Sequence, residues 1–92
     1  MQISIRHKLS ESDAAKRIKT RISELKKEYS ISGMSTKWKG STLSFSYKGV
    51  EGEMVVSSES VDIEAKVPLL LRPFTGKAEK EIKKELKYIL QV

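Results

Sequence analysis

The chain has no cysteine, a single histidine and only two prolines in its 92 residues. Without cysteine it can form neither disulfides nor thiolate metal sites, and it has no cysteine nucleophile. No stretch approaches the roughly 18 consecutive apolar residues of a membrane-spanning helix. The start of the chain also lacks the apolar run of a signal peptide. These absences favour a soluble, cytoplasmic protein with no membrane span.

Patterns for catalysis and metal binding are also missing. The one histidine, His7, lies on the apolar side of an alternating segment, which is typical of a hydrogen-bonded structural histidine. Nucleophilic catalysis needs a base beside the nucleophile, and metal sites gather His, Cys or closely spaced carboxylates. The acidic residues between positions 51 and 64 instead alternate with apolar residues or lie in a turn. The sequence therefore predicts a non-enzymatic protein with no cofactor, no metal site and no catalytic residue.

Charge is abundant and unevenly placed. The net charge is +6, and residues 1–50 hold 11 Lys and Arg against 4 Asp and Glu, whereas residues 51–92 hold 7 against 8. A basic half attracts anionic partners such as nucleic acid or phospholipid headgroups. A solvated helix face that keeps the protein soluble is the commoner origin of such a cluster. The basic face of the first predicted helix consists of Lys16, Arg17, Lys19, Arg21, Lys26 and Lys27.

The spacing of the apolar residues predicts a single α+β domain over residues 1–92. Apolar and polar residues alternate along five segments, as in half-buried strands, and apolar residues recur every three or four positions along two others, as in amphipathic helices. An antiparallel sheet of about five strands, with one face covered by helices, accounts for every apolar stripe. The predicted strands cover residues 2–9, 34–38, 42–47, 50–56 and 61–71, and the predicted helices 11–29 and 75–90.

Local sequence also predicts how several segments end. Ser10 or Ser12 can cap the first helix, and Thr75 can cap the second. The glycines of the stretch YKGVEG supply the positive φ that a hairpin turn favours. Pro68 cannot donate a hydrogen bond to a strand ladder, so the last strand is expected to lie at a sheet edge or to bulge near that residue.

The stretch VPLLLRPF, residues 67–74, contains the densest apolar run. Alternation predicts that Leu69 and Leu71 belong to the buried face and that, with Phe74, they close the core against Ile82 and Leu86 of the last helix. Arg72 is expected to be extended because proline follows it, and to face solvent. Leu71→Ala should then nearly unfold the protein, while Leu70→Ala, on the polar side, should leave its thermal stability almost unchanged.

A second interpretation of this stretch is a small apolar patch or the mouth of a pocket. Trp38 lies between two lysines, but alternation places it opposite them, which favours a core residue or pocket wall over a base-stacking platform. A pocket between the last helix and the sheet is a further interpretation, with walls from Trp38, Phe45, Ile63, Val67 and Ile82. A core this small can rarely spare a cavity without losing stability. The candidate ligand or partner surface is Pro68, Leu70, Arg72, Phe74 and Trp38.

Several of these features are shared with a known family. They include His7 with Leu9, the Ala-Ala-Lys that begins at Ala14, Trp38 with Gly40, and above all LLLRPFTGKAEKEI over residues 69–82. On these residues the chain resembles the small polyhydroxyalkanoic acid system proteins, also called granule-region proteins, over nearly its whole length. The resemblance implies a bacterial setting near polyester storage granules. It brings no catalytic or ligand-binding residues with it.

The residues and the resemblance together leave alternatives open. One is a non-enzymatic accessory protein of polyhydroxyalkanoate metabolism that binds a granule surface, a granule protein or a small apolar acyl compound. The order of elements also resembles a shortened helix-grip fold, whose larger members hold apolar ligands between sheet and helix. The alternative function is a small basic module that binds nucleic acid through the first helix. Either protein could be a monomer or a homodimer.

Overall fold

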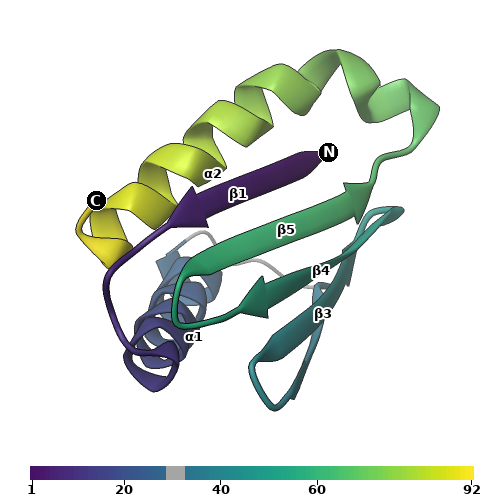
Figure 1. Cartoon of the computed structure of the whole chain (residues 1–92). Coiled ribbons are helices and arrows are strands. Elements are labelled where there is room, and N and C mark those ends of the chain that lie inside the picture. The colour runs from purple at the N-terminus through teal and green to yellow at the C-terminus, as the bar shows by residue number, and fades with distance from the viewer. Residues whose placement is uncertain (29–32) are drawn as a thin grey trace.

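The computed structural model describes residues 1–28 and 33–92, and its elements follow the predicted order (Figure 1). Tyr29, the last residue of the predicted first helix, lies outside the described residues. A short 3₁₀ helix, η1, separates the last strand from the last helix. The elements are β1 (Gln2–Arg6), α1 (Glu11–Glu28), β2 (Ser35–Lys39), β3 (Thr42–Tyr47), β4 (Val50–Val56), β5 (Ser60–Lys66), η1 (Leu69–Phe74) and α2 (Thr75–Leu90).

The five strands form one antiparallel sheet in the order β1-β5-β4-β3-β2. Strands β2 to β5 follow one another as a meander, and β1 pairs with β5 at the end of that meander. The register places Ile3 opposite Ile63, and Ile63 opposite Met54, so that apolar residues of neighbouring strands share one face. The predicted α+β class and the predicted order of elements are confirmed.

Two-residue turns join the central strands. Tyr47 pairs with Val50 across the turn between β3 and β4, and both intervening residues, Lys48 and Gly49, have positive φ. Positive φ at both central positions matches the right-handed twist of the flanking strands. The prediction of a hairpin there is confirmed for Gly49, while Gly52 lies inside β4 and serves a packing role described below.

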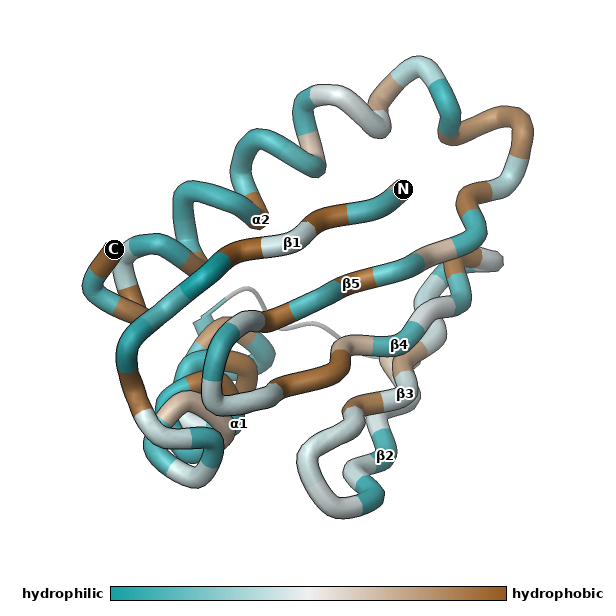
Figure 2. Tube along the Cα trace, in the orientation of Figure 1, coloured by the Kyte–Doolittle hydropathy of each residue, from teal (hydrophilic) through white to brown (hydrophobic). Residues whose placement is uncertain are grey.

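Both helices cover one face of the sheet, and the core lies between them. Hydrophobic and hydrophilic residues alternate along β1 and β5 (Figure 2), and the apolar set of each strand points toward the helices. Ser10 caps α1, since its Oγ accepts a hydrogen bond of 3.1 Å from the backbone N–H of Asp13. The buried core consists of Ile3, Ile5, Ala14, Ala15, Ile18, Leu43, Met54, Val56, Val61, Ile63, Leu86 and Leu90.

His7 is buried beside this core and is hydrogen-bonded at both ring nitrogens. The backbone N–H of Leu9 donates to Nδ1 at 3.0 Å, so Nε2 carries the proton and donates to the carbonyl of Ser57 at 2.8 Å. The prediction of a structural, hydrogen-bonded histidine is confirmed.

The predicted long strand over residues 61–71 is too long. Strand β5 ends at Lys66, two residues before Pro68, and it is an interior strand with β1 on one side and β4 on the other. The expectation of an edge or a bulge at Pro68 is therefore wrong. Proline has no N–H for a ladder, and the chain leaves the sheet before reaching it.

The prediction that Leu69, Leu71 and Phe74 close the core is also wrong. Leu69 is 75% exposed and Phe74 is 64% exposed, while Leu71 is only partly buried. Arg72 lies within η1 and is not extended, although it faces solvent as expected. In a 3₁₀ helix residues three apart lie above one another. The alternation of apolar and polar residues that continues in the sequence after Lys66 therefore does not place them on opposite faces.

The spacing of apolar residues over 75–90 predicts that Ala78, Ile82, Leu86 and Ile89 form the buried stripe of α2, and this is partly correct. Leu86 is buried, and Ile82 and Ile89 pack against the core, but Ala78 is exposed and Leu90 is buried in addition. Thr75 is the first residue of α2 and its side chain makes no capping hydrogen bond, so the prediction that it caps the helix is wrong. The shortened helix-grip arrangement stays a prediction, supported by the order of elements.

Candidate functional site

An apolar cavity of about 480 Å³ lies between the helices and the sheet, and we call it the helix–sheet cavity. Its volume falls in the range of small-molecule sites, roughly 300–1,000 Å³. Nearly all of its lining is apolar, which is the usual character of such sites. The lining residues are Met1, Ile22, Leu25, Lys26, Met34, Thr36, Leu43, Phe45, Tyr47, Val50, Met54, Ile63, Val67, Leu71, Phe74, Thr75, Ala78 and Ile82.

The polar contacts between the two helices involve residues outside the cavity wall. Arg21 of α1 pairs with Glu85 of α2, and the Nη1 of Arg17 donates to the carbonyl of Ile89 at 3.2 Å. The α2 residues of these contacts belong to its C-terminal half. The cavity wall instead takes Thr75, Ala78 and Ile82 from the N-terminal half of α2, together with residues 22, 25 and 26 of α1.

Gly52 shapes the floor of the cavity. Phe45 of β3 lies opposite Gly52 of β4. A Cβ placed on Gly52 would lie 2.7 Å from the Cζ of Phe45 and 2.6 Å from the backbone oxygen of Glu64. The aromatic ring therefore lies across the glycine, where any side chain would displace it. This packing explains why a glycine with ordinary backbone angles occurs in the middle of a strand.

Two polar side chains in the wall have different environments. The Nζ of Lys26 donates to the Oγ1 of Thr36 at 2.9 Å, which joins α1 to β2. The Oγ1 of Thr75 is buried and, among the described residues, it is the one buried side-chain oxygen or nitrogen without a hydrogen-bond partner. A buried hydroxyl without a hydrogen-bond partner costs free energy. A ligand atom that bonded to the hydroxyl of Thr75 would recover that cost.

The predicted pocket is present at the expected place, between α2 and the sheet. Four of the five predicted wall residues line it, namely Phe45, Ile63, Val67 and Ile82. Trp38 does not. It packs against the core from β2, and the Nζ of Lys19 lies 4.8 Å from the centre of its ring. Alternation therefore placed Trp38 on the correct face, but too far along β2 to reach the cavity.

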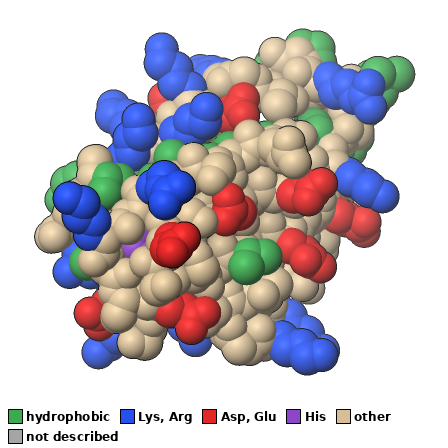
Figure 3. Space-filling view, in the orientation of Figure 1, with side chains coloured by type: hydrophobic (Ala, Val, Ile, Leu, Met, Phe, Trp, Pro, Cys, Tyr) green, Lys and Arg blue, Asp and Glu red, His purple; other side chains and the backbone are tan. Residues whose placement is uncertain are grey.

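The predicted ligand or partner surface is divided by the fold. Pro68, Leu70, Arg72 and Phe74 lie together in and beside η1, whereas Trp38 belongs to β2, at the other side of the sheet from β5. Leu70 is 88% exposed, as expected, and Leu69 and Phe74 are exposed beside it. Figure 3 shows hydrophobic and basic side chains projecting at the corner where η1 joins α2. We call Leu69, Leu70 and Phe74 the η1 corner.

The predicted basic face of α1 is partly used inside the molecule. Arg21 contacts Glu85 of α2 as well as Glu24 and Glu28 of its own helix, and the hydrogen bond to Glu85 is the main reason that its pKa is raised. Arg17, Lys19 and Lys26 make the contacts given above. Lys16 and Lys27 are exposed. The six residues therefore do not form one free cationic surface.

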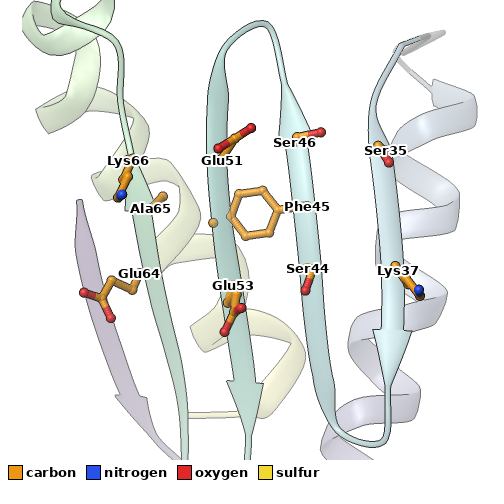
Figure 4. A pocket seen from close by; sticks show the side chains of 11 residues that line it. Ser35, Lys37, Ser44, Phe45, Ser46, Glu51, Glu53, Glu64, Ala65 and Lys66 are labelled. Atoms are coloured by element: carbon orange, nitrogen blue, oxygen red, sulfur yellow. The ribbon is translucent and has the colours of Figure 1, made fainter.

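The opposite face of the sheet is open and polar. Figure 4 shows the side chains of Ser35, Lys37, Ser44, Glu53 and Glu64 standing on this face, over a shallow hollow. Within the described residues no group of three or more His, Cys, Asp and Glu could hold a metal ion. The predicted carboxylates thus lie on the wet face of the sheet, as the alternation indicated.

Asp62, on the same face, has two hydroxyl partners. The Oγ of Ser4 donates to one carboxylate oxygen at 2.6 Å, and the Oγ of Ser60 donates to the other at 2.7 Å. The hydrogen bond from Ser4, followed by that from Ser60, lowers the pKa of Asp62 below its ordinary value of 3.8. Hydrogen bonds to the charged form favour that form.

The sequence alone did not point to Leu71, Met54 or Thr75 as residues of a site. Leu71 and Met54 carry no signal beyond apolarity. Thr75 carried one signal, the possibility of a helix cap, and that signal was misleading because Thr75 is the first residue of α2 and its buried hydroxyl bonds to nothing in the described residues. None of the helices within residues 1–28 and 33–92 is long and apolar enough to cross a membrane.

The fold and the cavity define a small α+β protein with a five-stranded antiparallel sheet, helices over one face and an apolar cavity beneath them. The chain belongs to the family described as "Putative polyhydroxyalkanoic acid system protein", whose model matches residues 1–90. The family suggested by the sequence is thereby confirmed. Comparisons with curated proteins and with solved structures gave no match.

Proposed function

We propose that this protein is a non-catalytic accessory protein of the polyhydroxyalkanoic acid system that holds an acyl chain in the helix–sheet cavity. The observation that carries the proposal is the cavity itself, about 480 Å³ with an almost wholly apolar wall. The cavity opens to solvent beside Phe74 and Ala78. Apolar surface in contact with water is unfavourable, and a bound apolar chain would remove the wall of the cavity from water.

The polar groups of the wall support binding over catalysis. They are the side chains of Lys26, Thr36, Tyr47 and Thr75. Lys26 is engaged with Thr36, and neither threonine has a histidine or carboxylate beside it in the lining. A hydroxyl nucleophile needs an adjacent base to accept its proton. Lys26 instead donates to the hydroxyl of Thr36, and the hydroxyl of Thr75 has no partner in the described residues. The family name links the chain to hydroxyalkanoic acids, and acyl chains are the apolar part of that chemistry.

A chain-length series tests the proposal. Alkanoates from hexanoate to dodecanoate would be titrated into the protein by calorimetry. Each methylene group that enters the cavity should tighten binding by about 0.8 kcal/mol, roughly fourfold in Kd, until the cavity is full. An absence of binding by every member of the series would contradict the proposal.

A cavity-filling variant places the ligand. Ala78 lies in the wall near its exposed rim, so Ala78→Phe should fill part of the cavity without overpacking the core. We expect it to weaken dodecanoate binding at least tenfold while the protein remains folded. Lys80→Phe adds the same ring to an exposed position of α2 outside the cavity wall, and should leave binding unchanged. Equal effects of the two variants would place the ligand elsewhere.

A second candidate function is docking on a granule surface through the η1 corner. Leu69, Leu70 and Phe74 are all more than half exposed, and Arg72 lies among them. Exposed apolar groups rimmed by polar ones commonly mark an interaction surface. Phe74 also lines the helix–sheet cavity, so the corner lies at its mouth.

Co-sedimentation with isolated polyhydroxyalkanoate granules tests this second function. The wild-type protein should sediment with the granules, and Leu70→Ser with Phe74→Ala should abolish sedimentation. The single variant Leu70→Ser separates the two functions, because Leu70 is absent from the cavity wall. It should weaken sedimentation and leave alkanoate binding intact. A wild-type protein that stays wholly in the supernatant would exclude the surface role.

A further inference from the structure

The two ends of the helix–sheet cavity differ in how well their polar groups are satisfied. At the end formed by α1 and β2, Lys26 and Thr36 bond to each other. At the end formed by η1 and α2, the buried Oγ1 of Thr75 has no partner in residues 1–28 and 33–92. Buried polar groups are nearly always hydrogen-bonded. Thr75 also lines this end of the cavity, so rotation about its χ1 would present the orphaned hydroxyl to a polar ligand atom there.

A second hollow, more polar than the cavity and called the polar hollow, adjoins the cavity at this end. It shares Met1, Val67 and Thr75 with the cavity, and Arg72 contributes to its wall. Arg72 makes no ion pair within the described residues, and the first turn of α2 carries no acidic side chain. An anion at this position would meet a guanidinium and a hydroxyl donor, with no carboxylate in that first turn to repel it.

We propose that the ligand is an acyl chain with an anionic, oxygen-bearing end, of which a free alkanoate is the simplest example. The proposal rests on the function proposed above and adds the class and the direction of the ligand. The hydrocarbon lies in the cavity, and the carboxylate lies at the junction of the cavity with the polar hollow. There Thr75 Oγ1 donates a hydrogen bond to one carboxylate oxygen, and Arg72 turns inward to pair with the other.

The geometry favours this direction over the reverse one. A carboxylate beside Lys26 would also meet a cation, but the ammonium group already donates to Thr36 and the threonine at the opposite end would remain without a partner. Charge-assisted hydrogen bonds are stronger than neutral ones. A carboxylate that accepts a hydrogen bond from Thr75 therefore stabilises the complex more than a carboxylate that becomes a second acceptor at Lys26.

Decanoate and 1-decanol test the proposal because they share one hydrocarbon chain and differ at the end group. We expect the wild-type protein to bind decanoate at least about tenfold more tightly, which is the low end of the effect of a hydrogen bond to a charged group. Thr75→Val and Arg72→Gln should each remove most of this preference while 1-decanol binds as before. Thr75→Val should also raise the melting temperature of the ligand-free protein, because it removes an unsatisfied buried hydroxyl.

Lys26→Met is the control for the reverse direction, and it should keep the preference for decanoate. A preference that disappears in Lys26→Met and persists in Thr75→Val would overturn the proposed direction. Equal binding of decanoate and 1-decanol by the wild-type protein would overturn the anionic class and leave the cavity function standing. Binding of neither compound would overturn the proposed function together with this inference.

Discussion

At the scale of single residues, small groups decide how the sheet can pack. Gly52 is the clearest case, because its missing side chain is the space that the ring of Phe45 occupies. Gly76 is the contrasting case, since an added Cβ there would meet nothing within 4 Å and its backbone angles are ordinary. The same residue type is thus required by packing at one position and free to change at the other.

Gly52→Ala should destabilise the protein by about 1–3 kcal/mol, the usual cost of overpacking. The new methyl group would lie 2.6 Å from the backbone oxygen of Glu64, and backbone cannot rotate away as a side chain can. Gly76→Ala is the matched control. It should stabilise the protein by about 0.4–1 kcal/mol, because alanine reduces the entropy of the unfolded chain. Urea denaturation measures the free energy of unfolding of both variants. A Gly52→Ala variant as stable as the wild type would show that the neighbouring strands shift to accommodate the methyl group.

The hydrogen bonds of Asp62 predict that the stability of the protein depends on pH. Its carboxylate accepts hydrogen bonds from Ser4 and Ser60, and its pKa is lowered by them. A lowered pKa in the folded state contributes stability above the ordinary value of 3.8 and loses it as the pH falls through the folded pKa. Asp62→Asn should therefore reduce the free energy of unfolding at neutral pH, by less than about 1 kcal/mol because the group is solvent-screened.

The difference between Asp62→Asn and the wild type should shrink as the pH falls below 4. Ser4→Ala should change stability in the same direction, since it removes the larger of the two causes of the pKa shift. Ser44→Ala changes an exposed serine on the same face whose side chain makes no hydrogen bond within the described residues, and it should change stability little. A loss that is the same at pH 3 and pH 7 would show that Asp62 acts through packing instead.

At the scale of elements, η1 is where the chain departs from its own periodicity. Its three residues per turn place Leu71 and Phe74 on the side of the helix–sheet cavity, and leave Leu69 and Leu70 outside. A hydrogen bond of 2.9 Å from the backbone N–H of Leu71 to the carbonyl of Pro68 closes the first turn. The element therefore forms the mouth of the cavity, not part of the core.

Leucine-to-alanine variants separate these roles. Leu86→Ala should cost about 2–5 kcal/mol, because Leu86 is 4% exposed and belongs to the core. Leu70→Ala should stay within about 0.5 kcal/mol of the wild type, as for surface positions in general. Leu71→Ala should lie between the two and weaken alkanoate binding. This revises the expectation that Leu71→Ala nearly unfolds the protein, and thermal denaturation with calorimetric titration of decanoate checks it.

At the scale of the whole molecule, the distribution of charge bears on the nucleic-acid alternative. Helix α1 holds six of the eleven Lys and Arg residues of residues 1–50, but it also holds all four of the acidic residues there. Arg17 and Arg21 are held against α2, and Lys19 lies over Trp38. Acidic side chains gather over the strands of the open sheet face, and basic ones lie around them and over α2 (Figure 3). A hollow between α1 and α2 brings basic side chains and Tyr88 together, but three carboxylates, Glu24, Glu81 and Glu85, share its wall. The structure therefore offers cations to an anionic partner only among acidic side chains there.

We therefore expect only weak binding to DNA and RNA, without sequence preference. Any affinity at low salt should fall steeply as the salt concentration rises, since it would come from released counterions. A fluorescence anisotropy titration at two salt concentrations, with one single-stranded and one double-stranded oligonucleotide, measures this. Binding that persists at 200 mM salt or that distinguishes sequences would restore the nucleic-acid function.

The sequence by itself determined the elements and the faces of the sheet. Alternation along β1, β3 and β5 and the three-and-four spacing along α1 depend on nearest neighbours and on the period of each secondary structure. Those periods are the same in every fold, so local pattern was enough to place His7 inside and the carboxylates of β4 and β5 outside. The family was also visible from the residues around η1.

Only the tertiary structure decided where β5 ends, which half of α2 lines the cavity, and which side chains meet there. The alternation continues through Leu71 although the strand does not, because a strand needs a partner ladder and the sequence does not show where the neighbouring strands stop. Likewise Arg21 meets Glu85 across a separation of 64 residues. The cavity and the orphaned hydroxyl of Thr75 arise from such long-range packing, which no local period encodes.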